Sequence, residues 1–192
     1  MNEGNVWESR YQAGTTGWDR GVTSKNLNYW LDNNLLQPSR ILIPGCGNGY
    51  EVITLTKLGF DVVAIDIAPT AIENLQALLN KESLNAELVL GDFFTWEPDE
   101  KFDVIFEQTS LCALPPELWG QYESQLHQWL KPQGKILAAF MQTGRENGPP
   151  YHCKMIDMKT LFPTTRWSWS EEHTAQEKDP GKTELLYQLQ KL

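Results

Sequence analysis

The sequence predicts an α/β fold built on a parallel, Rossmann-like sheet, and three observations support this. Apolar runs of strand length alternate with helical patterns along most of the chain. The run 41–43 stops at a turn with three glycines spaced Gly-x-Gly-x-Gly, residues 45–49, and a helical pattern follows. A second apolar run, 62–65, ends in the acid Asp66. Strand, glycine turn, helix, strand and acid is the order with which an open α/β sheet holds an adenosine.

The N-terminal segment, residues 1–36, is expected to form a helix, a loop and a second helix. Trp7, Tyr11 and Trp18 have the spacing that lines one face of a helix and the loop after it. The second helix is expected over about residues 23–34, with its first residue as the cap.

The remaining elements follow from short apolar runs and from helical periodicity between them. Runs without polar alternation, such as 102–106, are typical of strands buried on both faces, and strands that alternate with helices imply right-handed crossovers. Strands are expected at about 40–43, 61–66, 87–91, 102–106 and 135–141, and helices at about 51–58, 68–81 and 115–130.

The end of the chain changes character. Residues 167–170 and 184–190 alternate with period two, and residues 177–181 between them have a turn composition. We expect an antiparallel hairpin at the sheet edge. Without repeats or low-complexity tracts, residues 1–192 are expected to form a single domain.

The glycine spacing indicates which nucleoside is bound. Dinucleotide sites usually show Gly-x-Gly-x-x-Gly, in which the third glycine lets the helix pack against the strand beneath a pyrophosphate. Here Glu51 follows the turn, where its charge would repel a pyrophosphate. A ligand without phosphates that carries a cationic centre fits better, so we predict S-adenosylmethionine as cofactor and a methyltransferase. A nicotinamide oxidoreductase is the alternative.

The composition limits which kinds of binding partner and which cellular compartment are expected. The chain has 16 Lys and Arg against 25 Asp and Glu, a formal charge of −9, which disfavours a nucleic acid and favours a small-molecule acceptor. No apolar run of membrane-spanning length and no signal peptide pattern are found. The cysteines, 3 in number and far apart, do not suggest a disulfide framework. We expect a cytoplasmic protein, and a monomer because nothing in the chain demands a partner.

Four motifs are shared with a known family. They are Trp7-Glu8 with Trp18-Asp19, Ile43-Pro44-Gly45-Cys46-Gly47, Gly91-Asp92-Phe93-Phe94-Thr95-Trp96 and Gly148-Pro149-Pro150-Tyr151. In this order, over about residues 5–155, the chain resembles the thiopurine methyltransferase superfamily and, within it, the halide and thiol methyltransferases. The resemblance implies a seven-stranded sheet with an antiparallel last strand and helices on both faces. It also implies methyl transfer from S-adenosylmethionine to sulfur, halide or related soft anions.

The cofactor-binding residues are expected at strand ends. Gly45 and Gly47 let backbone N–H groups approach the ligand, and Asp66 is expected to accept bonds from the ribose hydroxyls. Asp92 and Phe93 end the third strand, where a carboxylate can accept from the adenine amine and a ring can cover its face.

The resemblance implies further site residues. Trp7, Tyr11 and Trp18 correspond to aromatic residues that cover the methionine part, although the family usually has Trp where Tyr11 stands; a sulfonium is attracted by aromatic faces. Glu107 follows the fourth strand and is a candidate cofactor contact and catalytic residue, although the halide and thiol branch usually has Asp there. Tyr151 is a candidate catalytic residue on the acceptor side.

Methyl transfer to a thiolate or halide at this site is expected to need no catalytic base from the side chains. A thiolate or halide is already nucleophilic, so positioning and exclusion of water suffice. No metal site is expected, because no Cys or His cluster has ligand spacing. Another small-molecule acceptor, such as an alcohol or amine, would need a base, for which Glu107, His152 and Tyr151 are the candidates. A module that binds S-adenosylmethionine without catalysis is the other alternative.

Overall fold

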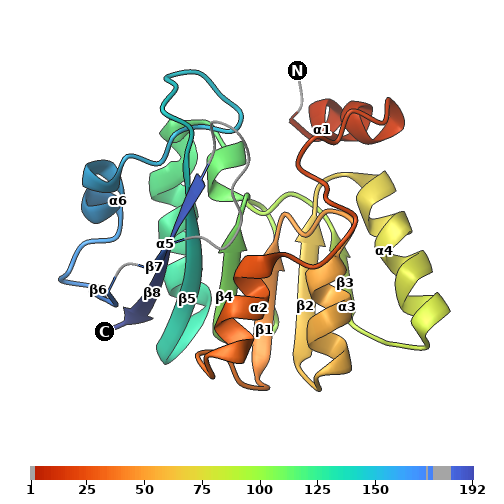
Figure 1. The fold of residues 1–192 in the computed structure, drawn as a ribbon, viewed down its shortest axis with the longest axis horizontal. Coiled ribbons are helices and arrows are strands. Elements are labelled where there is room, and N and C mark those ends of the chain that lie inside the picture. The colour runs from red at the N-terminus through yellow and green to blue at the C-terminus, as the bar shows by residue number, and fades with distance from the viewer. Residues whose placement is uncertain (1–2, 172, 175–182) are drawn as a thin grey trace. The chain divides into compact units, whose positions relative to one another are not determined.

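The computed structural model describes residues 3–171, 173–174 and 183–192 (Figure 1). The chain divides into two compact units, residues 1–97 and 98–192. The first unit is a three-stranded sheet with helices packed against it. Its elements are α1 (Glu3–Gln12), α2 (Lys25–Asp32), β1 (Arg40–Pro44), α3 (Tyr50–Lys57), β2 (Asp61–Asp66), α4 (Pro69–Glu82) and β3 (Glu87–Leu90).

The strands of the first unit are parallel, with β2 between β1 and β3. The side chains of Val62–Ile65 are all buried, as expected for a strand covered on both faces. Register places Pro44 of β1 beside Ile65, and Asp66 beside Leu90 of β3. The carboxyl ends of the three strands therefore meet at one edge of this sheet, where α/β sheets bind ligands.

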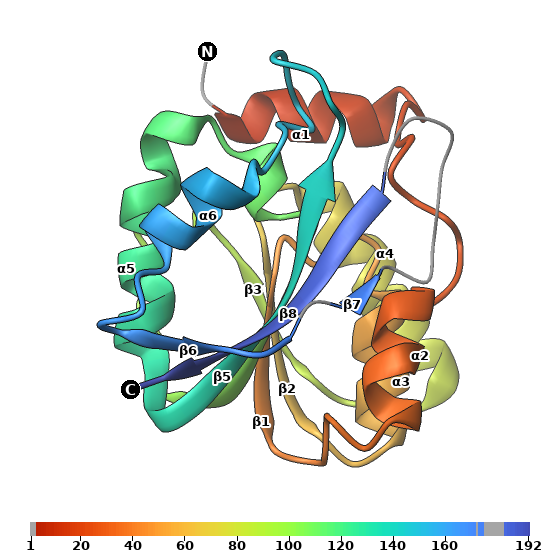
Figure 2. The same cartoon turned by 60° about the vertical axis from the view of Figure 1, so that its left-hand side comes forward.

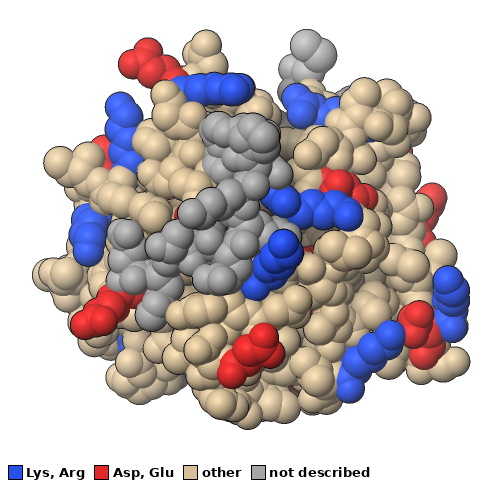
Figure 3. All heavy atoms as spheres, viewed as in Figure 1, with Lys and Arg blue, Asp and Glu red and all other residues tan. Residues whose placement is uncertain are grey.

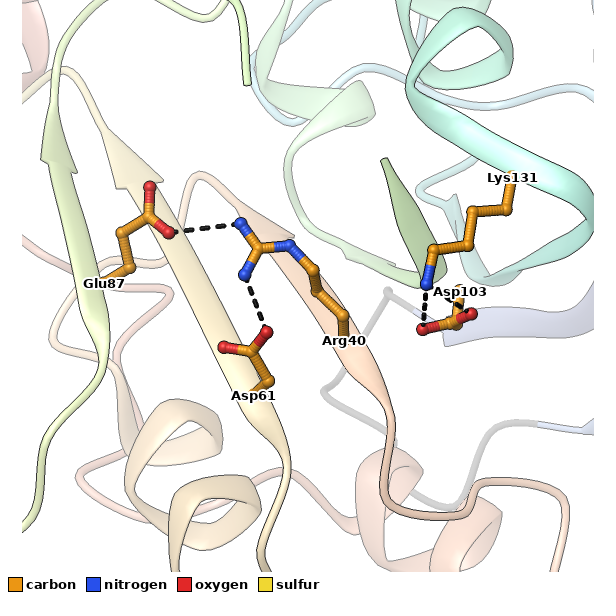
Figure 4. Close-up of polar contacts among 5 residues, drawn as sticks. All are labelled: Arg40, Asp61, Glu87, Asp103 and Lys131. Atoms are coloured by element: carbon orange, nitrogen blue, oxygen red, sulfur yellow. Dashed lines mark hydrogen bonds and ion pairs between the residues drawn. The ribbon is translucent and has the colours of Figure 1, made fainter. Parts of the chain in front are cut away.

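Arg40 joins the opposite ends of the same strands. Its guanidinium lies 2.7 Å from a carboxylate oxygen of Asp61 and 3.2 Å from one of Glu87, the first residues of β2 and β3 (Figure 4). Both carboxylates are largely exposed, so these ion pairs contribute little stability. They align the amino ends of the strands, away from the edge that carries the glycine turn.

The second helix starts one residue later than expected. Ser24 is its N-cap, and the Ser24 hydroxyl accepts the N–H of Leu27 at 3.1 Å. Thr23, the expected cap, instead bonds the hydroxyl of Thr54 in α3 at 2.6 Å. Two adjacent hydroxyl residues satisfy the cap pattern equally well, and packing against α3 decides between them.

The second unit contains the two strands of the predicted hairpin and seven further helices, 3-10 turns and strands. Its elements are β4 (Phe102–Gln108), the 3-10 turns η1 (Leu111–Ala113) and η2 (Pro116–Leu118), α5 (Trp119–Trp129), β5 (Leu130–Gln142), α6 (Met155–Leu161), β6 (Trp167–Trp169), β7 (His173–Thr174) and β8 (Thr183–Lys191).

The last strand is antiparallel, as predicted. β4 and β5 are parallel, whereas β8 runs antiparallel to β5 on one side and to β6 on the other (Figure 2). The hairpin of β6 and β8 is confirmed, and the turn expected at 177–181 lies outside the described residues. Besides β7, a two-residue strand that also pairs with β8, the described residues hold seven strands, the number predicted.

Two features of the second unit differ from the expectation. The turn expected before the fifth strand is a bulge within β5: Phe102 pairs with Leu130, and the next paired residues are Val104 and Lys135. Lys131 in this bulge donates to both carboxylate oxygens of Asp103 at 2.9 Å (Figure 4). The helix α6 was not expected, because its seven residues are too few to show a helical period.

The tryptophans divide between core and site. Trp30, Trp129 and Trp167 are fully buried and account for much of the aromatic content as packing. Trp7 and Trp18 are only half-buried, in the part of the first unit where the glycine turn lies.

Candidate functional site

The glycine turn follows β1 directly. Gly45, Gly47 and Gly49 have φ values of +58°, +55° and +72°, a region that favours glycine. A Cβ on Gly47 would lie 3.0 Å from the Tyr11 hydroxyl, and one on Gly49 would overlap the Leu75 side chain of α4. Gly49 is thus required for packing against α4, and Gly47 for the close approach of Tyr11.

Asp66 is bonded to the glycine turn. One of its carboxylate oxygens accepts the N–H of Gly47 at 2.8 Å, and the other accepts the N–H of Ala68 at 2.9 Å. Burial raises the pKa of Asp66, and these backbone donors oppose the rise. The carboxylate therefore fixes the turn relative to the start of α4, in the place where the ribose was expected.

The third strand ends beside Asp66. The N–H of Gly91 donates to the Asp66 carbonyl at 3.0 Å. Asp92 is exposed, and its carboxylate accepts the N–H of Phe94 at 2.8 Å. Phe93 is half-buried and packs edge-to-face on Phe94, with ring centroids 5.6 Å apart. The expected adenine-binding residues thus lie at the same sheet edge as the turn.

The three expected aromatic residues form one cluster. Trp18 packs edge-to-face on Trp7 and on Tyr11, at centroid separations of 5.3 and 5.8 Å. The Trp18 indole N–H lies 3.5 Å from the Tyr11 hydroxyl, which in turn faces Gly47. Burial, and after it the charge of Asp66, raises the pKa of the Tyr11 phenol, which therefore stays neutral. We call Trp7, Tyr11 and Trp18 the aromatic cover.

The aromatic cover is held in place by contacts between residues far apart in the sequence. The Glu8 carboxylate accepts the backbone N–H of Thr70 at 3.0 Å and the Thr70 hydroxyl at 2.6 Å. Asp19 accepts from the Asn48 side chain, within the glycine turn. One contact fixes α1 on the first turn of α4, and the other fixes the loop that carries Trp18.

Glu51, the residue expected to repel a pyrophosphate, has a structural contact. Its carboxylate accepts the N–H of Ser24 at 2.8 Å, at the start of α2. Its charge is still felt at the glycine turn, because it adds to burial and to Asp66 in raising the pKa of the Cys46 thiol. The hydrogen bond to Ser24 and the negative charge near Cys46 are both compatible with a glycine turn that disfavours phosphate groups.

Glu107 lies in the second unit, near the end of β4. Its side chain is 2% exposed, and its carboxylate accepts the N–H of Leu111 at 2.7 Å. Burial raises the pKa of Glu107 to about 7, the backbone donor opposes this, and the nearby Glu184 carboxylate adds to it. Gln108 donates to Glu184 at 3.1 Å. Glu107 is therefore a buried group that organises the loop between β4 and η1.

Tyr151 follows a proline pair in the second unit. The Gly148–Pro149 and Pro149–Pro150 peptide bonds are both cis. The N–H of Tyr151 donates to the Cys112 carbonyl in η1 at 2.7 Å, and its side chain is half-buried. The neighbouring His152 accepts the N–H of Thr143 through Nδ1 at 3.1 Å. The loop is thus fastened to η1 and to the end of β5.

Arg10 and Glu8 were not predicted. Arg10 follows Trp7 by three residues and therefore shares its helix face, and its guanidinium carbon lies 5.2 Å from the Trp7 ring centroid. This spacing is a signal that the sequence contains. The bond from Glu8 to Thr70 leaves no such signal, because it joins residues of two different helices.

The first unit fits S-adenosylmethionine. Glycines in left-handed conformations, an acid at the neighbouring strand end, and aromatic rings that can attract a cation lie together. In the described ranges, no group of three His, Cys, Asp or Glu residues is placed to hold a metal ion.

Comparisons with known proteins concern the family and the fold of the chain. The sequence model of the thiopurine S-methyltransferase family matches residues 2–188. A probable thiol methyltransferase 2 of Arabidopsis thaliana is 34% identical over 84% of this chain and 74% of its own. Thiocyanate methyltransferase 1 of Brassica oleracea is 32% identical over 76% of this chain and 66% of its own.

A solved structure shares the fold. It is the 1,6-didemethyltoxoflavin-N1-methyltransferase of Burkholderia thailandensis with bound 1,6-didemethyltoxoflavin and S-adenosylhomocysteine. Its TM-score is 0.78 at 17% identity, over 98% of this chain and 86% of that one. The Rossmann-like methyltransferase fold predicted from the sequence is confirmed.

Proposed function

The chain belongs to the thiopurine S-methyltransferase family, and we propose that it methylates a small soft nucleophile. It is an S-adenosylmethionine-dependent S-methyltransferase. The proposed acceptors are thiols or thiopurines, hydrosulfide, thiocyanate and halides. The names of the thiol and thiocyanate methyltransferases that it resembles support this range.

One observation supports the cofactor site above the others: three predicted features converge on Gly47. Its N–H is bonded to Asp66, and the Tyr11 hydroxyl lies only 3.0 Å from where a Cβ on Gly47 would be. Asp66 retains acceptor capacity for ribose hydroxyls, since each carboxylate oxygen has two lone pairs. We assign the remaining cofactor contacts to Gly45, to Asp92 and Phe93 at the adenine, and to the aromatic cover at the methionine part.

The proposed mechanism needs no general base. S-adenosylmethionine supplies an activated methyl group when bound. The chain's own residues orient the acceptor and exclude water, which removes hydration from an anionic nucleophile. We keep Tyr151 as the acceptor-side residue and Glu107 as a cofactor contact. Proton transfer by either residue is required only for a neutral alcohol or amine.

The test is turnover with S-adenosylmethionine, measured as S-adenosylhomocysteine formed. The panel contains iodide, thiocyanate, hydrosulfide, thiophenol and 6-mercaptopurine, with a catechol and an amine as controls. Turnover of the soft nucleophiles alone is the expected result. Faster turnover of the catechol or amine would overturn the proposed acceptor class, and cofactor binding without any turnover would favour a binding module.

Further proposals concern partners and surroundings. We propose a single-domain monomer that acts on small molecules in the cytoplasm. In the face drawn in Figure 3, Lys and Arg side chains lie scattered among acidic ones rather than in one stripe, which does not suit a nucleic-acid backbone. All three cysteines are buried free thiols, as is usual in a reducing compartment. No described helix is long and apolar enough to cross a membrane.

A further inference from the structure

Arg10 places a positive charge within the aromatic cover. Its guanidinium carbon lies 5.2 Å from the centroid of Trp7 and 5.8 Å from that of Trp18, and its side chain is half-buried. Trp7, Arg10 and Tyr11 share one face of α1, and Tyr11 faces Gly47. A guanidinium packed on ring faces keeps the N–H donors along its edge available for a planar anion.

The charge of Arg10 is not neutralised locally. Among the side chains that the structure describes, no carboxylate forms an ion pair with Arg10. Glu8, two residues away, is bonded to Thr70, and Asp19 is bonded to Asn48 and to the N–H of Gly21. In a chain of net charge −9, a half-buried cation that has no ion-pair partner among the described side chains and that packs on the rings of the aromatic cover can serve an anionic ligand group.

We propose that Arg10 binds the carboxylate of the methionine part of S-adenosylmethionine. This inference rests on the proposed function, because it uses the aromatic cover as the site of the methionine part. The bond also has an electrostatic consequence. A bare guanidinium beside a sulfonium would repel it, whereas a guanidinium paired with the carboxylate leaves the aromatic rings free to attract the sulfonium.

The acceptor anion is the other possible partner of Arg10, and a matched ligand pair distinguishes the two. S-adenosylmethionine and decarboxylated S-adenosylmethionine differ only in the carboxylate. The dissociation constants of both, without acceptor, are to be measured by calorimetry for the wild type, Arg10→Met and Arg10→Lys. Arg20→Met, an exposed arginine of the same segment, is the control variant. Thermal unfolding without ligand verifies that each variant is folded.

Arg10→Met is expected to lower the affinity for S-adenosylmethionine about tenfold or more, which is the usual effect of losing a charge-assisted hydrogen bond. Decarboxylated S-adenosylmethionine should bind equally well or tighter, because the variant removes repulsion of its cationic amine. The affinity of Arg10→Lys for S-adenosylmethionine should lie between those of the wild type and Arg10→Met. Arg20→Met should leave the affinity for both ligands unchanged. An equal loss of affinity for both ligands, or no change in either affinity, overturns the proposal. A wild type that binds neither ligand would instead refute the proposed function.

Discussion

At the residue scale, Asp66 is the side chain on which most of the proposed cofactor site depends. We expect Asp66→Asn to weaken S-adenosylmethionine binding about tenfold or more, because an amide has one acceptor oxygen where the carboxylate has two. The Gly47 N–H bond at 2.8 Å would then compete with the ribose for one oxygen. Asp61→Asn is the matched control, since Asp61 starts the strand that Asp66 ends and is 61% exposed. Calorimetry measures the affinity of both variants for S-adenosylmethionine. An equal loss of affinity in the two variants would contradict the assignment of Asp66 to the cofactor site.

Glu107 makes a prediction about pH. Its folded-state pKa of about 7 lies above the ordinary 4.5, so the folded chain holds a proton that the unfolded chain releases between these values. Stability is therefore lost as pH rises through this window, by about 3 kcal/mol at most. Glu107→Gln keeps an acceptor for the Leu111 N–H and carries no charge. In urea unfolding, the stability of Glu107→Gln relative to that of the wild type should therefore increase from pH 5 to pH 8.

Two controls make the Glu107 test decisive. Glu117→Gln, at an exposed position in η2, should show a difference from the wild type that does not grow with pH. Glu184 is the other carboxylate that raises the pKa of Glu107, so Glu184→Gln should reduce the pH dependence without abolishing it. A Glu107→Gln variant that loses the same stability at every pH would contradict the raised pKa.

How much of the site was predictable from sequence differs from residue to residue. Gly47 and Asp66 were predictable because a left-handed turn and an acid at a strand end each leave a local mark. For Arg10 the only signal in the sequence is its helical spacing from Trp7. For Glu8 there is no local signal, because its partner Thr70 lies 62 positions away. Contacts between elements depend on packing, which local patterns do not encode.

At the element scale, α1 is attached to α4 through Glu8. The N-cap residue of α4, Ala68, has no side-chain bond to the helix start, and Glu8 accepts the free N–H of Thr70 in its place. We expect Glu8→Ala to cost about 1 kcal/mol of stability, as the loss of a helix cap does. It should raise amide exchange over residues 3–12 and weaken S-adenosylmethionine binding, because the aromatic cover is no longer held.

Gln12→Ala is the matched control for the attachment of α1. Gln12 donates to the same Glu8 carboxylate at 2.8 Å from within α1, so its loss leaves the bonds to Thr70 intact. Amide exchange over residues 3–12 should then stay near that of the wild type. Unchanged exchange in Glu8→Ala as well would show that other contacts hold α1.

The elements themselves were predicted to the extent that their signals are local. The strand β2 matches its prediction at both ends, because a buried apolar run between two acids has clear limits. The helix α6 was missed, since seven residues give no period. The sequence predicts a turn at the start of β5, because Pro132 and Gly134 have a turn composition, whereas in the structure these residues form a bulge.

At the scale of the whole molecule, net charge sets how the two substrates approach. The chain carries −9, the proposed acceptors are anions, and S-adenosylmethionine carries a net positive charge. Raising the ionic strength from about 10 mM to about 200 mM with sodium acetate screens both interactions. We expect kcat/KM for thiocyanate to rise about twofold, and kcat/KM for S-adenosylmethionine to fall by a similar factor.

The opposite signs separate this electrostatic effect from a general effect of salt on the enzyme. A change in stability or in the chemical step would move both kcat/KM values in the same direction, whereas screening of one net charge moves them apart. If thiocyanate slows as salt rises, a local cation such as Arg10 must outweigh the −9 of the whole chain in guiding the acceptor.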